Sequence, residues 1–425
     1  MGKNIWRFVL VVSLCLVLCA CQKDAGRKVN LDYGKPVFYP YPSAVWRLVL
    51  GGTKDDYVKD IFCYDGYIYI IGESNSSDIN FTSAIFGQKL FLGRLDFNGE
   101  IKNIWSFAAS SKNRYVKSLI IDECLYVLAE CELDTKSAVI YKVNLNTGQA
   151  VYKVLGSRLL EEDALDLIAD GNKLYVVGQN VERYYNVRNL FIEQLDLNLK
   201  QQNFQRFVRG ADLKYIGCVK NNDRLNVWVS AVAIEHSYPV MIDLTDSEYV
   251  YHNFERPFLG HKLLDAKALG DKTLLVFAKE NQNSAAYCFF ENGEFGALKS
   301  ILKEDAANGK IIPNGDCSAV FLDAQNPSYY FVSEKYFAVI NNINADLLSY
   351  KCFEDKKIAA ALAKQGGRQC LLLFKDYDLK ILYLETPENL TSFWIEEDYL
   401  ITAGNGDSDI IITLTKALPY QFIRS

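Results

Sequence analysis

The sequence predicts an all-β fold made of one four-stranded unit repeated along the chain. From Val45 onward, short apolar segments alternate with turns that contain Gly, Asn or Asp, which is typical of strands joined by hairpins. The same turn also returns at a nearly constant interval, because Asp96, Asn144, Asp196 and Asp243 follow one another in steps of 48, 52 and 47 residues. A four-stranded unit repeated every 50 residues or so is typical of a β-propeller.

The first unit shows the pattern most clearly. Its strands are expected at residues 57–63, 67–72, 89–96 and 100–107, and tight Asp65-Gly66 and Asn98-Gly99 turns close its first and last hairpins. In the recurring exit turn, the Asp or Asn side chain can hydrogen-bond the backbone two residues further on. Weaker copies of this turn occur at residues 291–293 and 342–344.

The second strand of the unit recurs along the whole chain. It is expected at residues 67–72, 125–130, 173–178, 225–231, 273–278, 329–333, 369–374 and 399–403. Eight blades therefore fit slightly better than seven, although the unit at 358–385 lacks an expected outer strand. The last unit supplies three strands (390–397, 399–405 and 409–416), and residues 45–50 are expected to supply its fourth and so remove the open sheet edges. A pair of β-sandwiches would not repeat one turn at a constant interval.

The N-terminus has the features of an export signal. Lys3 and Arg7 precede an apolar stretch, residues 8–18, which is too short to span a bilayer. The segment Leu18-Cys19-Ala20-Cys21 resembles a bacterial lipobox, which implies a lipoprotein signal peptide over residues 1–20 and lipid attachment, including palmitate-type acyl chains, at Cys21. An ordinary cleaved secretory signal is the alternative.

Residues 21–44 are expected to form a flexible tether between the lipid and a propeller over residues 45–425. The tether contains Pro36, Pro40 and Pro42 and has no hydrophobic periodicity. Gln22 after the cysteine implies, by the same resemblance, an outer-membrane lipoprotein. Its position, periplasmic or surface-exposed, stays open, with Lys23 and Asp24 resembling surface-export tags.

Eight cysteines follow Cys21, at irregular spacings and mostly within apolar segments. We interpret them mainly as buried free thiols, with disulfides as the alternative in an exported protein. The chain has only three histidines and no Cys/His cluster, so neither a metal site nor a cofactor is expected.

Two resemblances support the fold. The segments at 51–57, 65–68 and 95–99 resemble secreted bacterial propeller repeats of the "GGSGDD…DGGYIVAG…LDxxGN" kind. Residues 143–152 are similar to the "LDAxTGxxxW" portion of quinoprotein-type propeller repeats, a WD40-like architecture. Both motifs are structural, so the quinone cofactor of quinoprotein dehydrogenases is not implied here.

Catalytic motifs are not found in the sequence. It contains no GxSxG elbow, P-loop, HExxH or dinucleotide fingerprint, so no catalytic residue is assigned and an enzyme is the less favoured class. The acidic groups Asp55/Asp56, Glu161–Asp163, Glu396–Asp398 and Asp407/Asp409 are interpreted as turn caps, with catalysis or calcium binding as alternatives. A net charge of −6 with interspersed signs argues against nucleic acid as a partner.

The expected long loops share one face of the propeller. Residues 74–88, 181–188 and 303–315 all join second to third strands or connect one blade to the next, whereas short turns close the opposite face. Arg183, Tyr184, Tyr185 and Arg188 combine aromatic and cationic groups suited to recognition, so we predict ligand or partner binding there.

These observations predict a lipid-anchored, monomeric cell-envelope propeller that binds an envelope protein or a glycan, or serves as an assembly scaffold. Lipoproteins with eight-bladed quinoprotein-type propellers, which this chain resembles, act in outer-membrane assembly by docking partner domains. A polysaccharide-active enzyme on a propeller scaffold is the alternative function.

Overall fold

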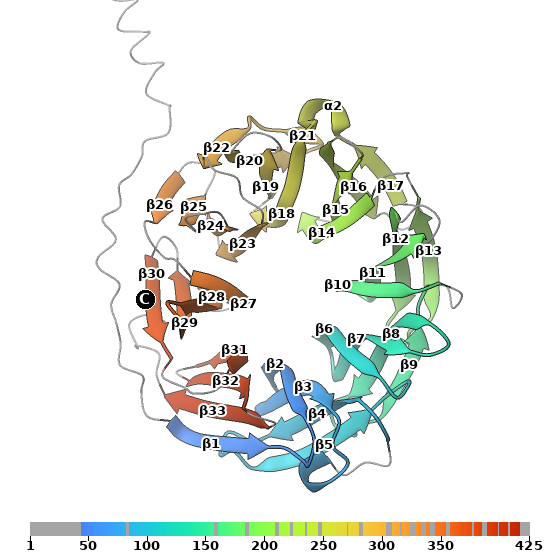
Figure 1. Ribbon diagram of the computed structural model, residues 1–425, viewed down its shortest axis with the longest axis vertical. Coiled ribbons are helices and arrows are strands. Elements are labelled where there is room, and N and C mark those ends of the chain that lie inside the picture. The colour runs from blue at the N-terminus through green and yellow to red at the C-terminus, as the bar shows by residue number, and fades with distance from the viewer. Residues whose placement is uncertain are drawn as a thin grey trace, which may run out of the picture.

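The computed structural model describes residues 44–416 except for short gaps. These gaps are residues 82–84, 157–159, 183–186, 209–211, 222–223, 234–235, 245–248, 270, 280–283, 303–307, 315–316, 324–327, 333–336, 341–344, 354–357, 376–377, 385–388, 398 and 407–408. Strand pairing in the described residues gives eight antiparallel sheets, or blades, arranged in a ring (Figure 1). The predicted all-β propeller with four-stranded blades is therefore confirmed.

We number the blades in chain order. Blade 1 holds β2 (Asp56–Tyr64), β3 (Tyr67–Ser74), β4 (Lys89–Leu95) and β5 (Ile101–Phe107). Blade 2 holds β6 (Asn113–Ile121), β7 (Cys124–Glu132), β8 (Lys136–Asn144) and β9 (Ala150–Val154). Blade 3 holds β10 (Glu162–Asp170), β11 (Lys173–Glu182), β12 (Val187–Asp196) and β13 (Gln201–Phe207). Blade 4 holds β14 (Asp212–Asn221), β15 (Arg224–Val232), β16 (Ser237–Leu244) and β17 (Tyr249–Asn253).

The second half of the ring follows the same plan. Blade 5 holds β18 (His261–Leu269), β19 (Lys272–Lys279), β20 (Ser284–Glu291) and an outer strand split into β21 (Glu294–Phe295) and β22 (Lys299–Leu302). Blade 6 holds β23 (Asn308–Asn314), β24 (Cys317–Asp323), β25 (Ser328–Val332) and β26 (Phe337–Ile340). Blade 7 holds β27 (Ala345–Phe353), β28 (Ile358–Gln365), β29 (Arg368–Lys375) and β30 (Asp378–Tyr383). Blade 8 holds β31 (Asn389–Glu396), β32 (Tyr399–Asn405), β33 (Ile410–Lys416) and β1 (Ala44–Leu50). Two short helices, η2 (Ile79–Phe81) and α2 (Glu255–Phe258), lie in connections.

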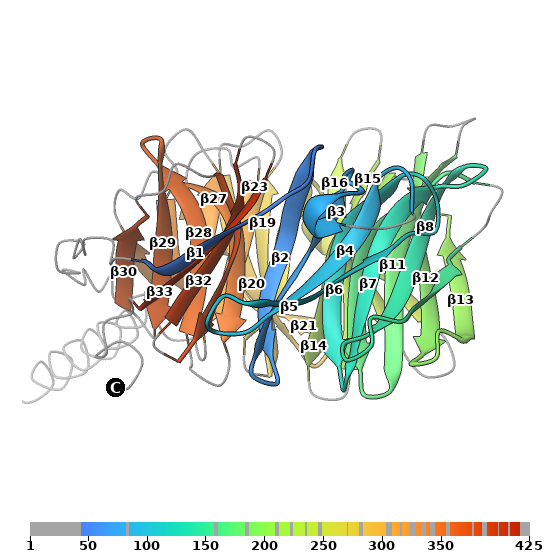
Figure 2. The same ribbon diagram turned by 90° about the horizontal axis from the view of Figure 1, so that it is seen from below.

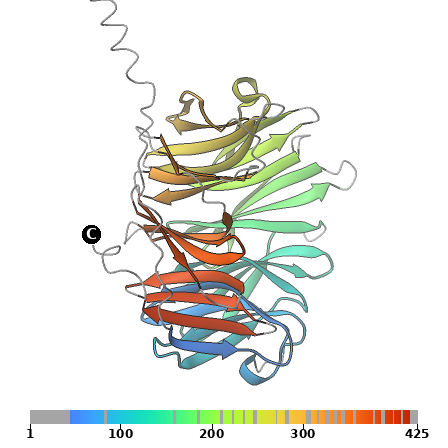
Figure 3. The ribbon, with the colours of Figure 1, turned by 60° about the vertical axis from the view of Figure 1, so that its left-hand side comes forward.

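The ring is closed by its N-terminal strand, as predicted. β1 pairs antiparallel with β33 and so completes blade 8 from the opposite end of the chain. Figure 3 shows β1 beside the red strands of this sheet. This pairing covers the outer edge of β33, which would otherwise be an unpaired sheet edge.

The recurring turns have the geometry that their residues predict. Asp65 and Gly66 both adopt positive φ, 46° and 71°, as a two-residue hairpin turn requires. At the exit of the third strand, Asp96 Oδ1 accepts hydrogen bonds from the backbone N–H groups of Asn98 and Glu100, both at 2.9 Å. Asn144 and Asp196 accept equivalent backbone bonds in blades 2 and 3. The side-chain role predicted for this repeat is confirmed.

The hydrophobic core lies between neighbouring blades. One buried cluster, for example, combines Ile71 and Leu92 of blade 1 with Leu125, Val127 and Val139 of blade 2. The next cluster combines side chains of blades 2 and 3 in the same way. Each sheet thus buries both of its faces, which is why its strands are apolar on both sides rather than alternating.

Three sequence expectations are corrected by the strand pairing. Residues 329–333 and 369–374 fall mostly in β25 and β29, which are third strands and not second strands of their blades. The unit at 358–385 does not lack an outer strand, because its inner strand β27 begins at Ala345. Second and third strands are apolar segments of similar length, so the sequence pattern does not distinguish them. Only the pairing partners decide which position a strand takes within its blade.

The ring has two distinct faces, which Figure 2 shows from the side. The loop face carries the connections between blades and the loops between second and third strands, and the turn face carries the remaining hairpin turns. Two of the expected long loops are shorter than predicted. In the loop expected at 181–188, β11 extends to Glu182 and β12 begins at Val187. Most of the second half of the loop expected at 303–315 belongs to β23, residues 308–314. Both Ala44, where β1 begins, and Lys416, where β33 ends, lie at the turn face.

The cysteines follow the prediction in part. Cys124, Cys131, Cys218, Cys288 and Cys370 are free thiols, and Cys131, Cys288 and Cys370 are fully buried. Cys63, Cys124 and Cys218 are half-buried, but Cys352 is exposed, contrary to expectation, because it lies on the inner strand β27. The side chain of Cys317 lies outside the described residues.

Candidate functional site

The inner strands of seven blades share one irregularity near the loop face. Each contains a register shift at the same point, for example between Val58 and Asp60 in β2 and between Tyr115 and Lys117 in β6. The others are in β10, β14, β18, β27 and β31. A bulge bends its strand and re-aims the neighbouring side chains. The bulged residue is the one skipped between the two residues that flank each shift. We call the residue two positions before it the rim residue. The rim residues are Tyr57, Arg114, Asp163, Lys214, Lys262, Asp346 and Asn389.

The bulges create a repeated link between blades. The backbone N–H that follows a rim residue donates to a side chain of the preceding blade: Val58 to Asn405 Oδ1 at 3.0 Å, Tyr115 to Glu73 Oε1 at 2.7 Å and Ala164 to Glu130 Oε1 at 3.2 Å. In blade 6, which has no such shift, Ile311 N–H donates to Asp265 Oδ2 at 2.7 Å. We therefore count Lys310, which precedes Ile311, as the rim residue of blade 6. Each bond satisfies a buried amide, so a missing acceptor would be costly.

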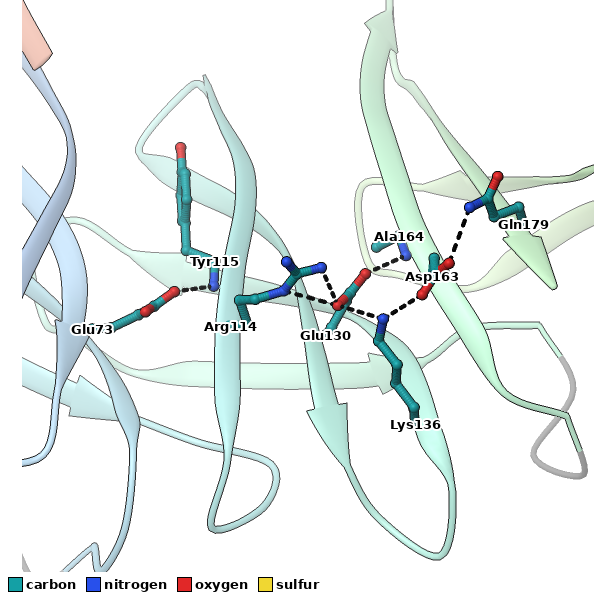
Figure 4. Close-up of polar contacts among 8 residues, drawn as sticks. All are labelled: Glu73, Arg114, Tyr115, Glu130, Lys136, Asp163, Ala164 and Gln179. Atoms are coloured by element: carbon teal, nitrogen blue, oxygen red, sulfur yellow. Dashed lines mark hydrogen bonds and ion pairs between the residues drawn. The ribbon is translucent and has the colours of Figure 1, made fainter. Parts of the chain in front are cut away.

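Glu130 is the centre of the most connected link (Figure 4). Its carboxylate is buried, with 3% of the residue exposed, and it receives Arg114 Nε at 2.9 Å, Lys136 Nζ at 3.1 Å and the Ala164 amide. Lys136 also contacts Asp163, which accepts a bond from Gln179 Nε2 at 3.0 Å. Although partial burial opposes it, hydrogen bonding from Lys136 and Gln179 lowers the pKa of Asp163, so this carboxylate stays charged.

Glu73 has the same role one blade earlier. It is 4% exposed and binds Lys59 Nζ at 3.2 Å and Gln88 Nε2 at 3.0 Å, in addition to the Tyr115 amide. In blades 1 and 2, then, a buried glutamate at the end of the second strand is surrounded by cations and amides of the loop face. These charges hold neighbouring blades together.

Blades 4 to 6 have a different arrangement at the same positions. Their rim residues Lys214, Lys262 and Lys310 line a hollow of about 140 Å³, together with Tyr215, Leu263 and Gly309. The residue paired opposite each of them on the second strand is Ser230, Ala278 or Phe321, whereas Glu73 and Glu130 stand opposite Tyr57 and Arg114. The residues paired opposite these three lysines therefore carry no charge.

The electrostatics of this hollow are correspondingly positive. Desolvation at its wall lowers the pKa of Lys214, and the positive charges of Lys262, Lys310 and Arg188 lower it further. Within the described part of the chain, neither Lys214 nor Lys310 forms an ion pair. Nearby carboxylates have other partners: Asp212 binds Arg188 Nη1 at 3.0 Å, and Asp265 binds the amides of Ala266 and Ile311.

Deeper in the ring, charged groups of the inner strands are paired. Lys351 Nζ lies 2.6 Å from Asp60 Oδ1, which also accepts from Ser392 Oγ at 2.8 Å. Lys117 contacts Asp166, and Lys267 lies 3.7 Å from Asp265.

The sequence-predicted binding residues are only partly described. Arg183, Tyr184 and Tyr185 lie outside the described residues, as does Cys21. Arg188 is exposed, and both its backbone N–H and its guanidinium bind Asp212. Arg188 therefore adjoins the lysine hollow but is already paired.

The acidic groups interpreted as turn caps have structural contacts. Asp56 is buried and its Oδ2 accepts bonds from Gly52 N–H at 2.8 Å and Ser76 Oγ at 2.9 Å. Glu162, at the equivalent place in blade 3, is also buried and binds Arg206. Among the described residues no group of His, Cys, Asp or Glu has the arrangement of a metal site. No helix in the described part of the chain is long and apolar enough to cross a membrane.

The rim lysines were missed in the sequence, although a signal was present. Lys214, Lys262 and Lys310 are each 48 residues apart, which matches the repeat period. Aligning the units on their inner strands, rather than on the exit turns, would have placed the three lysines at one position of successive blades.

Comparisons with known proteins identify the fold. No protein-family model matches the chain, and no curated protein sequence does. Among solved structures, the Dos1 propeller aligns with a TM-score of 0.53 at 10% identity, covering 88% of this chain and 96% of that one. BamB from Moraxella catarrhalis aligns at 0.48 and 10% identity, covering 88% and 99%. An acylaminoacyl peptidase from Pyrococcus horikoshii aligns at 0.48 and 10% identity, but the chain covers only 57% of that protein. At these identities the likeness shows the β-propeller fold.

Proposed function

We propose that the protein is a lipid-anchored cell-envelope scaffold that binds a protein partner through its loop face. The observation that carries the proposal is the distribution of exposed apolar side chains. Phe86, Leu133, Val208, Val232 and Leu259 are between 37% and 86% exposed, and all lie in connections or strand ends of the loop face. Several other exposed large apolar residues lie along outer strands, such as Val45 in β1 and Val151 and Tyr152 in β9, and none lies in the described hairpin turns of the turn face. Apolar side chains within a charged surface are typical of protein interfaces.

The position of the chain ends supports the same orientation. The described chain begins at Ala44, at the turn face, and 22 residues lie between it and Cys21. If Cys21 carries lipid, the turn face is the side nearer the membrane, and the loop face points away from it. We infer that the anchor leaves the loop face accessible to an envelope partner. Apart from Phe86, these exposed side chains are aliphatic and offer no ring that could stack on a sugar, which favours a protein over a glycan.

The anchor can be tested separately from the binding face. We expect Cys21→Ser to abolish incorporation of labelled fatty acid and to leave an unprocessed or soluble protein. Equal incorporation in the variant and the parent would exclude lipidation at Cys21. Protease treatment of intact cells then distinguishes the surface from the periplasm.

The binding face can be tested by crosslinking in cells. A photoreactive residue at position 86 or 259 of the loop face should crosslink to a partner protein, whereas one at position 200 of the turn face should not. Equal crosslinking from position 200 would contradict the proposal, and crosslinking to glycan alone would favour a saccharide partner. Replacing Arg183, Tyr184 and Tyr185 together by alanine should weaken binding of the captured partner by roughly tenfold, with thermal unfolding nearly unchanged.

A further inference from the structure

The connection from blade 4 to blade 5 carries one helical turn that is held in place by aromatic packing. This turn is α2 (Glu255–Phe258), which lies at the outer edge of the ring beside β21 (Figure 1). Phe258 is buried, and its ring centroid lies 5.1 Å from that of Phe277 and 4.5 Å from that of Phe295. A helix of four residues gains little from its own hydrogen bonds, so its position depends on these ring contacts.

The chain has only three histidines, and all of them contact this connection. At its start, the ring of His252 stacks on that of Phe254 with 6.3 Å between the centroids, and His236 Nε2 lies 2.9 Å from Glu255 Oε1. At its end, His261 packs against the last residue of α2. Histidine is the side chain whose charge ordinarily changes between pH 5 and 8, so acidification acts on both ends of the turn.

His261 is half-buried and packs against two phenyl rings. Its ring is nearly perpendicular to those of Phe258 and Phe277, with centroid distances of 5.9 and 6.3 Å. Burial disfavours the imidazolium form, and the positive charge of Lys279, which is paired opposite on β19, opposes it further. These effects outweigh the hydrogen bond from Nδ1 to the carbonyl oxygen of Leu259, so the pKa of His261 is lowered.

The two ends of α2 therefore respond to acid in opposite ways. Glu255 is already bound to His236, and a positive charge on His236 strengthens this pair. A positive charge on His261 instead disfavours its packed position against Phe258. The other charged or titratable side chains on the described elements around His261 are Lys262 on β18, Arg256 on α2, and Tyr238 and His252 on blade 4. None of these supplies a negative charge at acidic pH, so the charge on His261 is not offset.

We propose that α2 is an acid-released latch: protonation of His261 frees Phe258 from the ring, while the pair of His236 and Glu255 keeps the start of α2 attached. In the open state His261 regains the ordinary histidine pKa of about 6.5. Opening therefore becomes more favourable as the pH falls from this value through the lower one of the closed state, and it changes no further below that. Release uncovers the rings of Phe277 and Phe295, which supplies an apolar surface in acid alone. The latch does not depend on the partner binding proposed above.

Hydrogen exchange of the full-length protein tests the latch. Two backbone amides mark its ends, because Phe254 N–H donates to Pro239 O at 3.3 Å and Gly260 N–H donates to Ser237 O at 2.9 Å. Between pH 7.5 and pH 5 we expect protection of the Gly260 amide, corrected for intrinsic exchange, to fall about threefold or more, which half a pKa unit between the two states produces. Protection of the Phe254 amide should change less than about twofold. Mass spectrometry with single-residue fragmentation measures both. Unchanged protection at Gly260, or an equal fall at both amides, would overturn the proposal.

Matched variants assign the effect to one histidine. His261→Gln keeps an N–H donor near the carbonyl of Leu259 and cannot gain a charge, so protection of Gly260 should no longer depend on pH. The control is His252→Gln, which makes the same chemical change on the other side of the connection and should leave the pH dependence intact. Circular dichroism checks that both variants are folded. Loss of the dependence in both, or in neither, would contradict a latch governed by His261.

Titration of the histidines in the parent protein gives a readout that does not rely on a variant's stability. Because the chain has three histidines, selective carbon-13 labelling gives three ring signals, which single His→Gln changes assign. We expect His261 to titrate below about pH 6.5 and the exposure of Gly260 to follow that titration. An ordinary or raised value for His261 would overturn the latch, because the closed state would then bind the proton at least as well as the open one.

Discussion

Blades 1 to 3 and blades 4 to 6 use the same backbone position in two different ways. In the first group, Arg114 and Asp163 join a network with the buried Glu130 and with Lys136, which fastens blade 2 to blade 3. In the second group, Lys214, Lys262 and Lys310 face a hollow and oppose uncharged residues. The difference shows that one repeated position can join an inter-blade ion-pair network in some blades and line a hollow in others.

A single residue per blade accounts for this difference. The second-strand residue opposite the rim is Glu73 or Glu130 in blades 1 and 2, and Ser230 or Ala278 in blades 4 and 5. A buried glutamate draws cations into ion pairs and caps the amide of the next blade. Serine and alanine carry no charge, so they do neither.

The largest effect is expected from removing the buried Glu130, which should lower the stability of the first group of blades. Glu130→Ala leaves the Ala164 amide without its acceptor, removes the carboxylate partner of Arg114 and leaves Lys136 paired with Asp163 alone. We expect a loss of about 3 kcal/mol in the free energy of unfolding. Urea denaturation measures it. Glu132→Ala is the control, because Glu132 is exposed and pairs only with exposed Lys112, so a loss under about 0.5 kcal/mol is expected. Similar losses in the two variants would show that the network does not fasten the blades.

Thiol labelling can compare how often blade 2 and blade 5 open locally and expose a buried cysteine. Burial raises the pKa of Cys131 in blade 2 to about 11 and that of Cys288 in blade 5 to about 12, so neither reacts at pH 8 without local opening. We expect Cys288 to be alkylated several times faster than Cys131, since its blade lacks the Glu130 network. Mass spectrometry of timed samples measures both rates. In Glu130→Ala the two rates should become similar, and a constant ratio would argue against fastening by Glu130.

The smallest expected effect is the pH dependence caused by Lys214. Its pKa is lowered in the folded protein, so the protonated form opposes folding at neutral pH, and this cost disappears as the pH rises through the lowered value toward the ordinary lysine pKa. Because the side chain is exposed, the gain should be only a few tenths of a kcal/mol. Comparing urea midpoints at pH 7 and pH 10 should show this gain in the parent and not in Lys214→Gln. An equal pH dependence in both would assign the effect to other groups.

Local sequence signals were sufficient for most of the architecture. Asp65-Gly66 permits the positive φ of a tight hairpin, and Asp96 satisfies the amides of its own turn, so both features act within a few residues. Their repetition predicted the period, the four-stranded blades and the closure of blade 8 by β1. The prediction that residues 329–333 and 369–374 form second strands was wrong, because an apolar segment does not specify its pairing partner.

The sequence by itself determined the repeat, the turns and the strand that closes the ring, because these depend on backbone preferences and on contacts between near neighbours. It also contained the 48-residue spacing of Lys214, Lys262 and Lys310. Only the tertiary structure decided that these lysines share one hollow while Arg114 joins a buried carboxylate. That outcome depends on the bulges that aim each rim residue and on which residue stands opposite it. Both follow from the register between strands and the packing of one blade against the next.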